Sequence, residues 1–237
     1  SAPEHYTLGP LGATLLAAHT GCELTTLGWR PTATGRIAYS PWLGHDTGVN
    51  ELLTLLAAYA RHTPGSGLTL WLSERFCARR WEDMIRPDAY AHWQDPSSAA
   101  EDRRLLPFFL EYDTGTQSLS RVEAKLAGYA AFTASTGTRP ALLIHTRTAS
   151  RDRAIRHRLT QPARELGLRV ATSSLDFTTT TPWGSWWTPL EPAARRTTLI
   201  ALAAHWTDLT PAAGLEPTDA DTALALPVPP LPPTTQS

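Results

Sequence analysis

The chain has 237 residues, of which 42% are hydrophobic and 18% charged, with a formal net charge of −1. These values suit one sizeable α/β domain with accessory segments, and the balanced charge gives no argument for a nucleic-acid partner. The sequence contains no apolar run of about twenty residues and no secretory signal, and Cys22 and Cys77 lack zinc or disulfide spacing, so we expect a cytoplasmic protein with reduced thiols.

The N-terminal third contains two predicted helices. Residues 6–18 predict a short strand followed by a short helix, with Pro10 in its first turn. Residues 20–44 are rich in Gly, Thr and Pro and predict a connector. A longer helix is expected from about Thr47, because apolar residues recur on one face up to the turn at residues 64–67.

The remaining elements alternate between strands and helices. Three strands are expected at residues 68–73, 86–93 and 105–112, a helix at 118–134, a buried strand at 141–145, an arginine-rich helix at 150–166, a strand at 168–172, an edge element at 183–190 and a terminal helix at 193–206. This order predicts an α/β sandwich with a mixed sheet.

The C-terminal residues differ from the rest in composition. Residues 207–237 are dominated by Pro, Thr, Ala and Asp, which predicts a disordered or polyproline-like tail. The tail contains four acidic residues and no Lys or Arg, so residues 1–206 hold 21 basic and 18 acidic residues. That excess of three is compatible with DNA contact without arguing for it.

One constellation points to metal-dependent chemistry. Lys125 is the only lysine, against twenty arginines. Glu111 and Asp113 lie two residues apart on a predicted strand and therefore share a face, and Asp88 can join them if the two strands are adjacent. These carboxylates are candidate ligands for Mg²⁺ or Mn²⁺, and Lys125 could reach them from the following helix to orient water or neutralise charge on phosphorus. The alternative is that a single lysine lies there by chance.

Two resemblances rest on these residues. Pro87-Asp88 followed by Glu111-x-Asp113 resembles the PD-(D/E)xK nuclease superfamily, with Asp113 at the usual lysine position and Lys125 as a migrated replacement. Closer similarity is to the replication-relaxation family, in residues 44–50, 70–74, 86–88, 109–116 and 125–129. It spans about residues 44–146, while residues 6–18 resemble the wing and closing helix of a winged-helix domain.

These two resemblances together imply a fold, a domain order and an activity. The implied fold is a PD-(D/E)xK-like sandwich with a central mixed sheet flanked by helices, plus a remnant of an N-terminal winged helix. The domains would be residues 1–19 (wing and closing helix), 20–44 (connector), 45–206 (nuclease-like domain) and 207–237 (tail). The implied activity is nicking or relaxation of plasmid or mobile-element DNA by a metal-dependent endonuclease.

Other charged residues are secondary candidates. Arg121 precedes Lys125 by one helical turn, and Arg153, Arg156 and His157 share the arginine-rich helix, so all four are candidate phosphate contacts. A solvated helix face is the alternative.

Several other side chains have two interpretations each. Glu51 and Glu74 are possible accessory metal ligands, against a helix-capping carboxylate and a surface ion pair. His45 and His145 have structural and catalytic interpretations, and a tyrosine nucleophile is conceivable at Tyr112 or Tyr129. The absence of a Gly-x-Ser-x-Gly elbow excludes a serine hydrolase of that type.

Two other function classes stay open beside the nuclease. One is a non-catalytic DNA-binding initiator with a degenerate nuclease core. The other is an interaction module that binds replication or transfer proteins through the tail. We expect no membrane partner, and the sequence leaves the oligomeric state open.

Overall fold

The computed structural model describes residues 7–32, 43–81, 84–95, 105–176, 179–213 and 215. The chain divides into two compact units, Ser1–Thr47 and Gly48–Ser237. None of the helices within the described ranges is long and apolar enough to cross a membrane.

The first unit contains helix α1, Pro10–Thr20, which confirms the predicted helix with proline at its start. The helix ends at Gly21, whose φ of 65° lets its N–H bond back to the carbonyls of Ala17 and Ala18. The short strand predicted before it does not form in residues 7–9, and Tyr6 lies outside the described residues.

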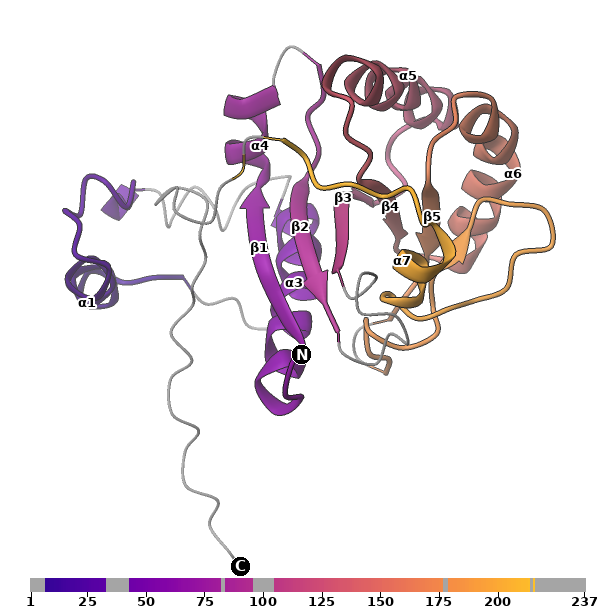
Figure 1. The fold of residues 1–237 in the computed structure, drawn as a ribbon. Coiled ribbons are helices and arrows are strands. Elements are labelled where there is room, and N and C mark those ends of the chain that lie inside the picture. The colour runs from indigo at the N-terminus through magenta and orange to yellow at the C-terminus, as the bar shows by residue number, and fades with distance from the viewer. Residues whose placement is uncertain are drawn as a thin grey trace, which may run out of the picture. The chain divides into compact units, whose positions relative to one another are not determined.

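The second unit is built on a six-stranded mixed sheet in the order β1-β2-β3-β4-β5-β6. The strands are β1 (Gly67–Ser73), β2 (Ala89–Gln94), β3 (Leu105–Asp113), β4 (Ala141–Thr146), β5 (Val170–Ser173) and β6 (Thr188–Pro189). The β3–β4 and β4–β5 pairs are parallel and the other pairs antiparallel. Strands β1 to β5 therefore lie side by side in the order of the sequence (Figure 1).

Helices cover both faces of the sheet. They are α3 (Leu43–His62), α4 (Glu74–Trp81), α5 (Leu119–Thr136), α6 (Ala149–Glu165) and α7 (Ala201–His205). Apolar residues of α3 and α7 share one core with Ala91, Phe108 and Leu143 of the sheet. Those of α4, α5 and α6 share a second core with Phe109 and Leu142 on the opposite face. The predicted α/β sandwich with a mixed sheet is confirmed.

Three helices differ from the sequence prediction. Helix α3 begins at Leu43, four residues before the expected start. Helix α4 was not predicted; it buries Cys77 and Trp81, one turn apart, although most of its other residues are charged. The terminal helix expected over residues 193–206 is reduced to Ala201–His205, because Ala193 has φ 58° and Thr197 pairs with Trp187 as a β-bridge.

The chain continues along the domain after α7. Figure 1 shows this yellow segment running back across the domain toward α4. Asp208 forms an ion pair with Arg169, Ala212 is buried, and the N–H of Ala212 donates to the Tyr90 hydroxyl at 2.8 Å. Residues 207–213 therefore pack against the sheet, although the sequence prediction assigned them to the tail. The rest of that predicted tail lies outside the described residues apart from residue 215.

Candidate active site

The predicted residues Asp88, Glu111 and Asp113 lie at one edge of the sheet. Because β2 runs antiparallel to β1 and β3, the start of β2 lies beside the ends of its two neighbours. The parallel register then places Thr146, the end of β4, beside Asp113, the end of β3. Asp88 precedes β2 and Glu111 lies near the end of β3, so both reach the same edge.

Glu111 is the centre of the arrangement. It is buried, and its neighbour two residues back, Phe109, belongs to the core beneath α5. Lys125 Nζ donates to Glu111 Oε2, and the Tyr129 hydroxyl donates to Glu111 Oε1 at 2.5 Å. Lys125 and Tyr129 are one turn apart on α5, so both can meet one carboxylate. We call Asp88, Glu111, Lys125 and Tyr129 the Glu111 cluster.

Asp88 is fixed beside Glu111 by backbone contacts. Its own N–H donates to the Leu110 carbonyl at 3.0 Å, and its Oδ2 accepts the N–H of Tyr112 at 2.7 Å. Asp88 therefore contacts the backbone of Leu110 and Tyr112, the two residues that flank Glu111. The predicted adjacency of the two strands is confirmed, and the charge of Asp88 acts on Glu111 at the sheet edge.

The contacts of the cluster shift the pKa values of Glu111, Lys125 and Tyr129. Burial, followed by the charge of Asp88, raises the pKa of Glu111 to about 7, although Lys125 and Tyr129 act in the opposite direction. Burial lowers the pKa of Lys125, but the charges of Glu111, Asp88 and Asp113 outweigh that effect and the net shift is upward. Burial and the Glu111 charge raise the pKa of Tyr129 well above its ordinary value. Lys125 is therefore a cation and Tyr129 a neutral donor at neutral pH.

Asp113 does not join the cluster as the predicted third ligand. It shares a strand face with Glu111, as expected, but its Oδ1 accepts the N–H of Gly115 at 2.5 Å. Its Oδ2 accepts from Nε and Nη2 of Arg151, at 3.1 and 2.8 Å. Throughout the described part of the chain, no group of three or more His, Cys, Asp or Glu side chains could hold a metal. The predicted three-carboxylate set is therefore not assembled, and Asp113 acts on Lys125 only through its charge.

The donor set leaves two carboxylates that could hold a metal. Mg²⁺ commonly binds one or two carboxylates and keeps several water ligands. Asp88 and Glu111 are two such groups, and a metal bound to Glu111 Oε2 would have to replace the Lys125 ammonium there.

The two accessory carboxylates are not part of the cluster. Glu74 starts α4 and accepts from Arg86 Nε at 3.2 Å, which matches the surface ion pair. Glu51 is exposed on α3, and because this helix begins at Leu43 the residue is too far along to cap its first turn. Its charge acts instead on Tyr112, whose ring lies against Gly48.

Tyr112 and His145 are register partners on the sheet face opposite Glu111. His145 stacks on Tyr112, with centroids 5.1 Å apart, and its Nε2 accepts the N–H of Leu175. Burial lowers the pKa of His145 to about 4, so the ring is neutral at physiological pH. The Nδ1 atom of His45 lies 3.4 Å from Oδ1 of its neighbour Asp46. Tyr129 is buried and engaged by Glu111, which excludes it as an exposed nucleophile.

The arginine-rich helix α6 is only partly available for DNA. Arg151 forms an ion pair with Asp113 and donates to the Gln117 carbonyl. Arg156 Nη1 donates to the Thr188 carbonyl at 3.3 Å. Arg158 pairs with Glu123 of α5. Arg153 and His157 are exposed, as is Arg121 in the first turn of α5.

The contacts of two residues at the site were not predicted. The sequence offers Tyr129 only as a conceivable nucleophile, although its spacing of four from Lys125 places both side chains on one face of α5. Arg151 is not among the candidate residues that the sequence offers. No local pattern pairs it with Asp113, because the two residues are 38 positions apart and meet only through the β3–β4 crossover.

Comparison with known proteins gives one match. The family model described as replication-relaxation matches residues 1–146. No curated protein and no solved structure matches the chain. Because the matched region covers more than half of the sequence, the chain belongs to the replication-relaxation family.

Proposed function

We propose that the Glu111 cluster is the catalytic centre of a Mg²⁺- or Mn²⁺-dependent DNA endonuclease of PD-(D/E)xK type. The observation that carries this proposal is the convergence of Asp88, Glu111 and the single lysine of the chain at one sheet edge. Membership of a replication-relaxation family supports plasmid or mobile-element DNA as the substrate and the cytoplasm as the location. The winged-helix origin of residues 1–19 stays a prediction.

Each residue of the cluster has a distinct role in this proposal. Asp88 and Glu111 would hold the metal, which supplies charge stabilisation and an activated water when bound. Lys125 carries a positive charge on a flexible stem and would stabilise negative charge on the scissile phosphate. Tyr129 orients Glu111 through a buried hydrogen bond. Arg151 binds Asp113, which would therefore not act as a metal ligand.

A non-catalytic DNA-binding initiator is the second candidate function. It is favoured by one observation: both oxygens of Glu111 and both oxygens of Asp113 are engaged by donors of the chain itself. In this case the ion pairs would be structural remnants of a nuclease core, and family function would rest on DNA binding alone.

Cleavage of supercoiled plasmid separates the two functions. The chain would be compared with Lys125→Ala, Asp88→Asn and the matched control Asp113→Asn, each with Mg²⁺, Mn²⁺ or EDTA. The nuclease proposal expects metal-dependent nicking that is lost in the first two variants and retained in the third. DNA binding by all four proteins without nicking by any of them would overturn catalysis and favour the initiator.

A further inference from the structure

Four exposed arginines lie at the same sheet edge as the Glu111 cluster. Arg75 follows the end of β1, Arg86 precedes β2, Arg121 is in the first turn of α5, and Arg147 follows the end of β4. They come from four different connections, which the antiparallel and parallel registers bring to one edge. We call these four residues the arginine rim.

The rim extends along the sheet on both sides of Glu111. Arg75 and Arg86 lie toward β1, and Arg86 is bound to Glu74 beside the start of α4. Arg121 is one turn before Lys125 on α5. On the other side, Arg147 follows Thr146, the register partner of Asp113, and its charge acts on Tyr112. A linear polyanion lying along this edge would therefore meet cations before and after Lys125.

Three acidic groups at this edge are paired with internal cations, and Asp152 in the first turn of α6 is half-buried. Glu74 is paired with Arg86, Asp113 with Arg151, and Glu111 with Lys125. Asp88 accepts a backbone N–H, and Glu51 is the exposed carboxylate near Tyr112. The guanidinium groups of Arg75, Arg121 and Arg147 are exposed, so the outer surface of this edge is more basic than the balanced charge of the whole chain indicates.

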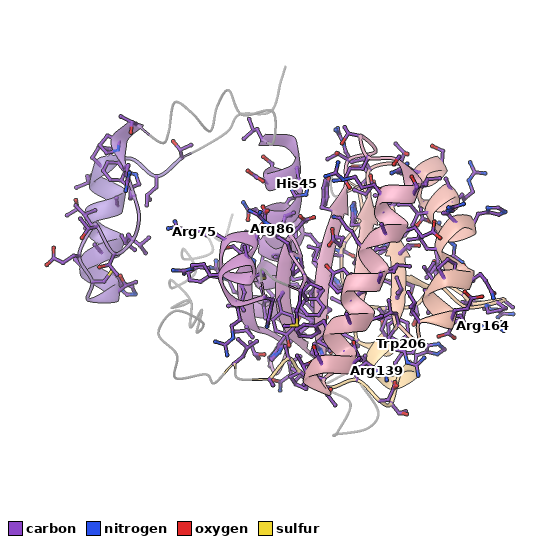
Figure 2. All side chains as sticks on the ribbon, turned by 90° about the horizontal axis from the view of Figure 1, so that it is seen from above. His45, Arg75, Arg86, Arg139, Arg164 and Trp206 are labelled. Carbon is purple, nitrogen blue, oxygen red and sulfur yellow. The ribbon has the colours of Figure 1, made fainter. Side chains whose placement is uncertain are left out.

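The outer face of α6 makes a poorer track. Its remaining exposed cations include Arg153 and Arg164, and Figure 2 shows Arg164 at the end of the domain opposite Arg75 and Arg86. Three other arginines of this helix have internal partners: Arg151 pairs with Asp113, Arg156 donates to the Thr188 carbonyl, and Arg158 pairs with Glu123. A backbone bound there would run along α6, away from the edge that carries Lys125.

We propose that the arginine rim binds the phosphodiester backbone of DNA and places a phosphate at Lys125. Guanidinium groups bind phosphate oxygens in a bidentate manner, and contacts of this kind fix the position of DNA without reading its sequence. The inference rests on the proposed function for the phosphate at Lys125. DNA binding by the rim itself does not require cleavage.

The test compares charge-reversed rim and opposite-edge variants at equal change in net charge. Arg121→Glu with Arg147→Glu is matched by Arg61→Glu with Arg164→Glu, two exposed arginines that precede β1 and β5 at the opposite edge of the sheet. Binding of a fluorescein-labelled duplex is followed by anisotropy in EDTA over a series of salt concentrations, so that cleavage plays no part. Arg121→Gln with Arg147→Gln repeats the test with a milder change, and circular dichroism confirms that each variant is folded.

The rim variants are expected to lose roughly tenfold or more in affinity. The number of ions released on binding, read from the salt dependence of the affinity, should fall by about two. The opposite-edge variants should change affinity less than about twofold, as expected for charges remote from the bound phosphates. Equal losses in both pairs, a larger loss in the opposite-edge pair, or no DNA binding by the parent chain would overturn the rim. If the rim result holds while plasmid nicking is absent, the catalytic proposal fails and the binding surface stands.

Discussion

Replacing Lys125 with methionine should cost stability in a pH-dependent way. Methionine keeps much of the apolar stem and removes the ammonium from the buried Glu111, whose side chain is 9% exposed. Breaking a fully buried ion pair costs about 3–5 kcal/mol. The Lys125 side chain is 36% exposed, so solvent screening lowers the attraction. Protonation of Glu111 also limits the penalty, and we expect a loss of about 2 kcal/mol above neutral pH.

The direction of the pH dependence follows from the raised pKa of Glu111. Its folded pKa is about 7, against an ordinary value of 4.5, so the folded chain holds this proton more tightly and loses stability as pH rises between those values. Without Lys125 the folded pKa rises further, and the loss continues to higher pH. At low pH, Glu111 is protonated in both folded proteins, and the difference between them should shrink to less than about 0.5 kcal/mol.

Urea unfolding of the parent chain and Lys125→Met at about pH 5.5 and pH 8.5 measures this difference. Arg121→Met is the matched control, because Arg121 is an exposed cation on the same helix. Its unfolding free energy should change little at either pH. Equal losses for Lys125→Met at both pH values would show that the stem, and not the charge, stabilises the fold.

Three further changes test neighbouring parts of the structure. Tyr129→Phe removes the hydroxyl that donates to Glu111 and should cost about 1–3 kcal/mol in urea unfolding; an unchanged midpoint would contradict the hydrogen bond. Gly48→Ala would place a Cβ 2.1 Å from Tyr112 Cζ, so we expect a loss of about 1–3 kcal/mol, whereas Gly44→Ala on the same helix meets no described atom within 4 Å and should not destabilise. Ending the chain at Trp206 rather than residue 215 removes Asp208 and Ala212 and should lower the melting temperature; equal melting temperatures would show that this segment contributes nothing.

Much of the fold could be predicted from local patterns. Apolar patterns predicted strands β1 to β5 to within three residues of their bounds, and the spacing of Glu111 and Asp113 correctly placed both on one face of β3. Ser118, predicted as the start of a helix, caps α5 through the N–H of Arg121. These features depend on neighbouring residues and therefore appear in the sequence.

The failures concern contacts between distant segments. Asp113 was assigned to the metal because nothing near it in the sequence reveals Arg151 as its partner. The terminal helix was overextended because the bridge between Trp187 and Thr197 overrides helix propensity. Likewise, nothing near Arg156 in the sequence reveals that this candidate phosphate contact donates to the Thr188 carbonyl.

We propose that Asp88 and Glu111 form a divalent cation site in which the metal displaces Lys125 from Glu111 Oε2. Titration of the chain with Mn²⁺, followed by electron paramagnetic resonance of the free ion, tests this without any nuclease activity. We expect one bound ion per chain, loss of that ion in Asp88→Asn and Glu111→Gln, and tighter binding in Lys125→Met. No bound Mn²⁺ in any of the four proteins, or unchanged binding in Glu111→Gln, would contradict the account.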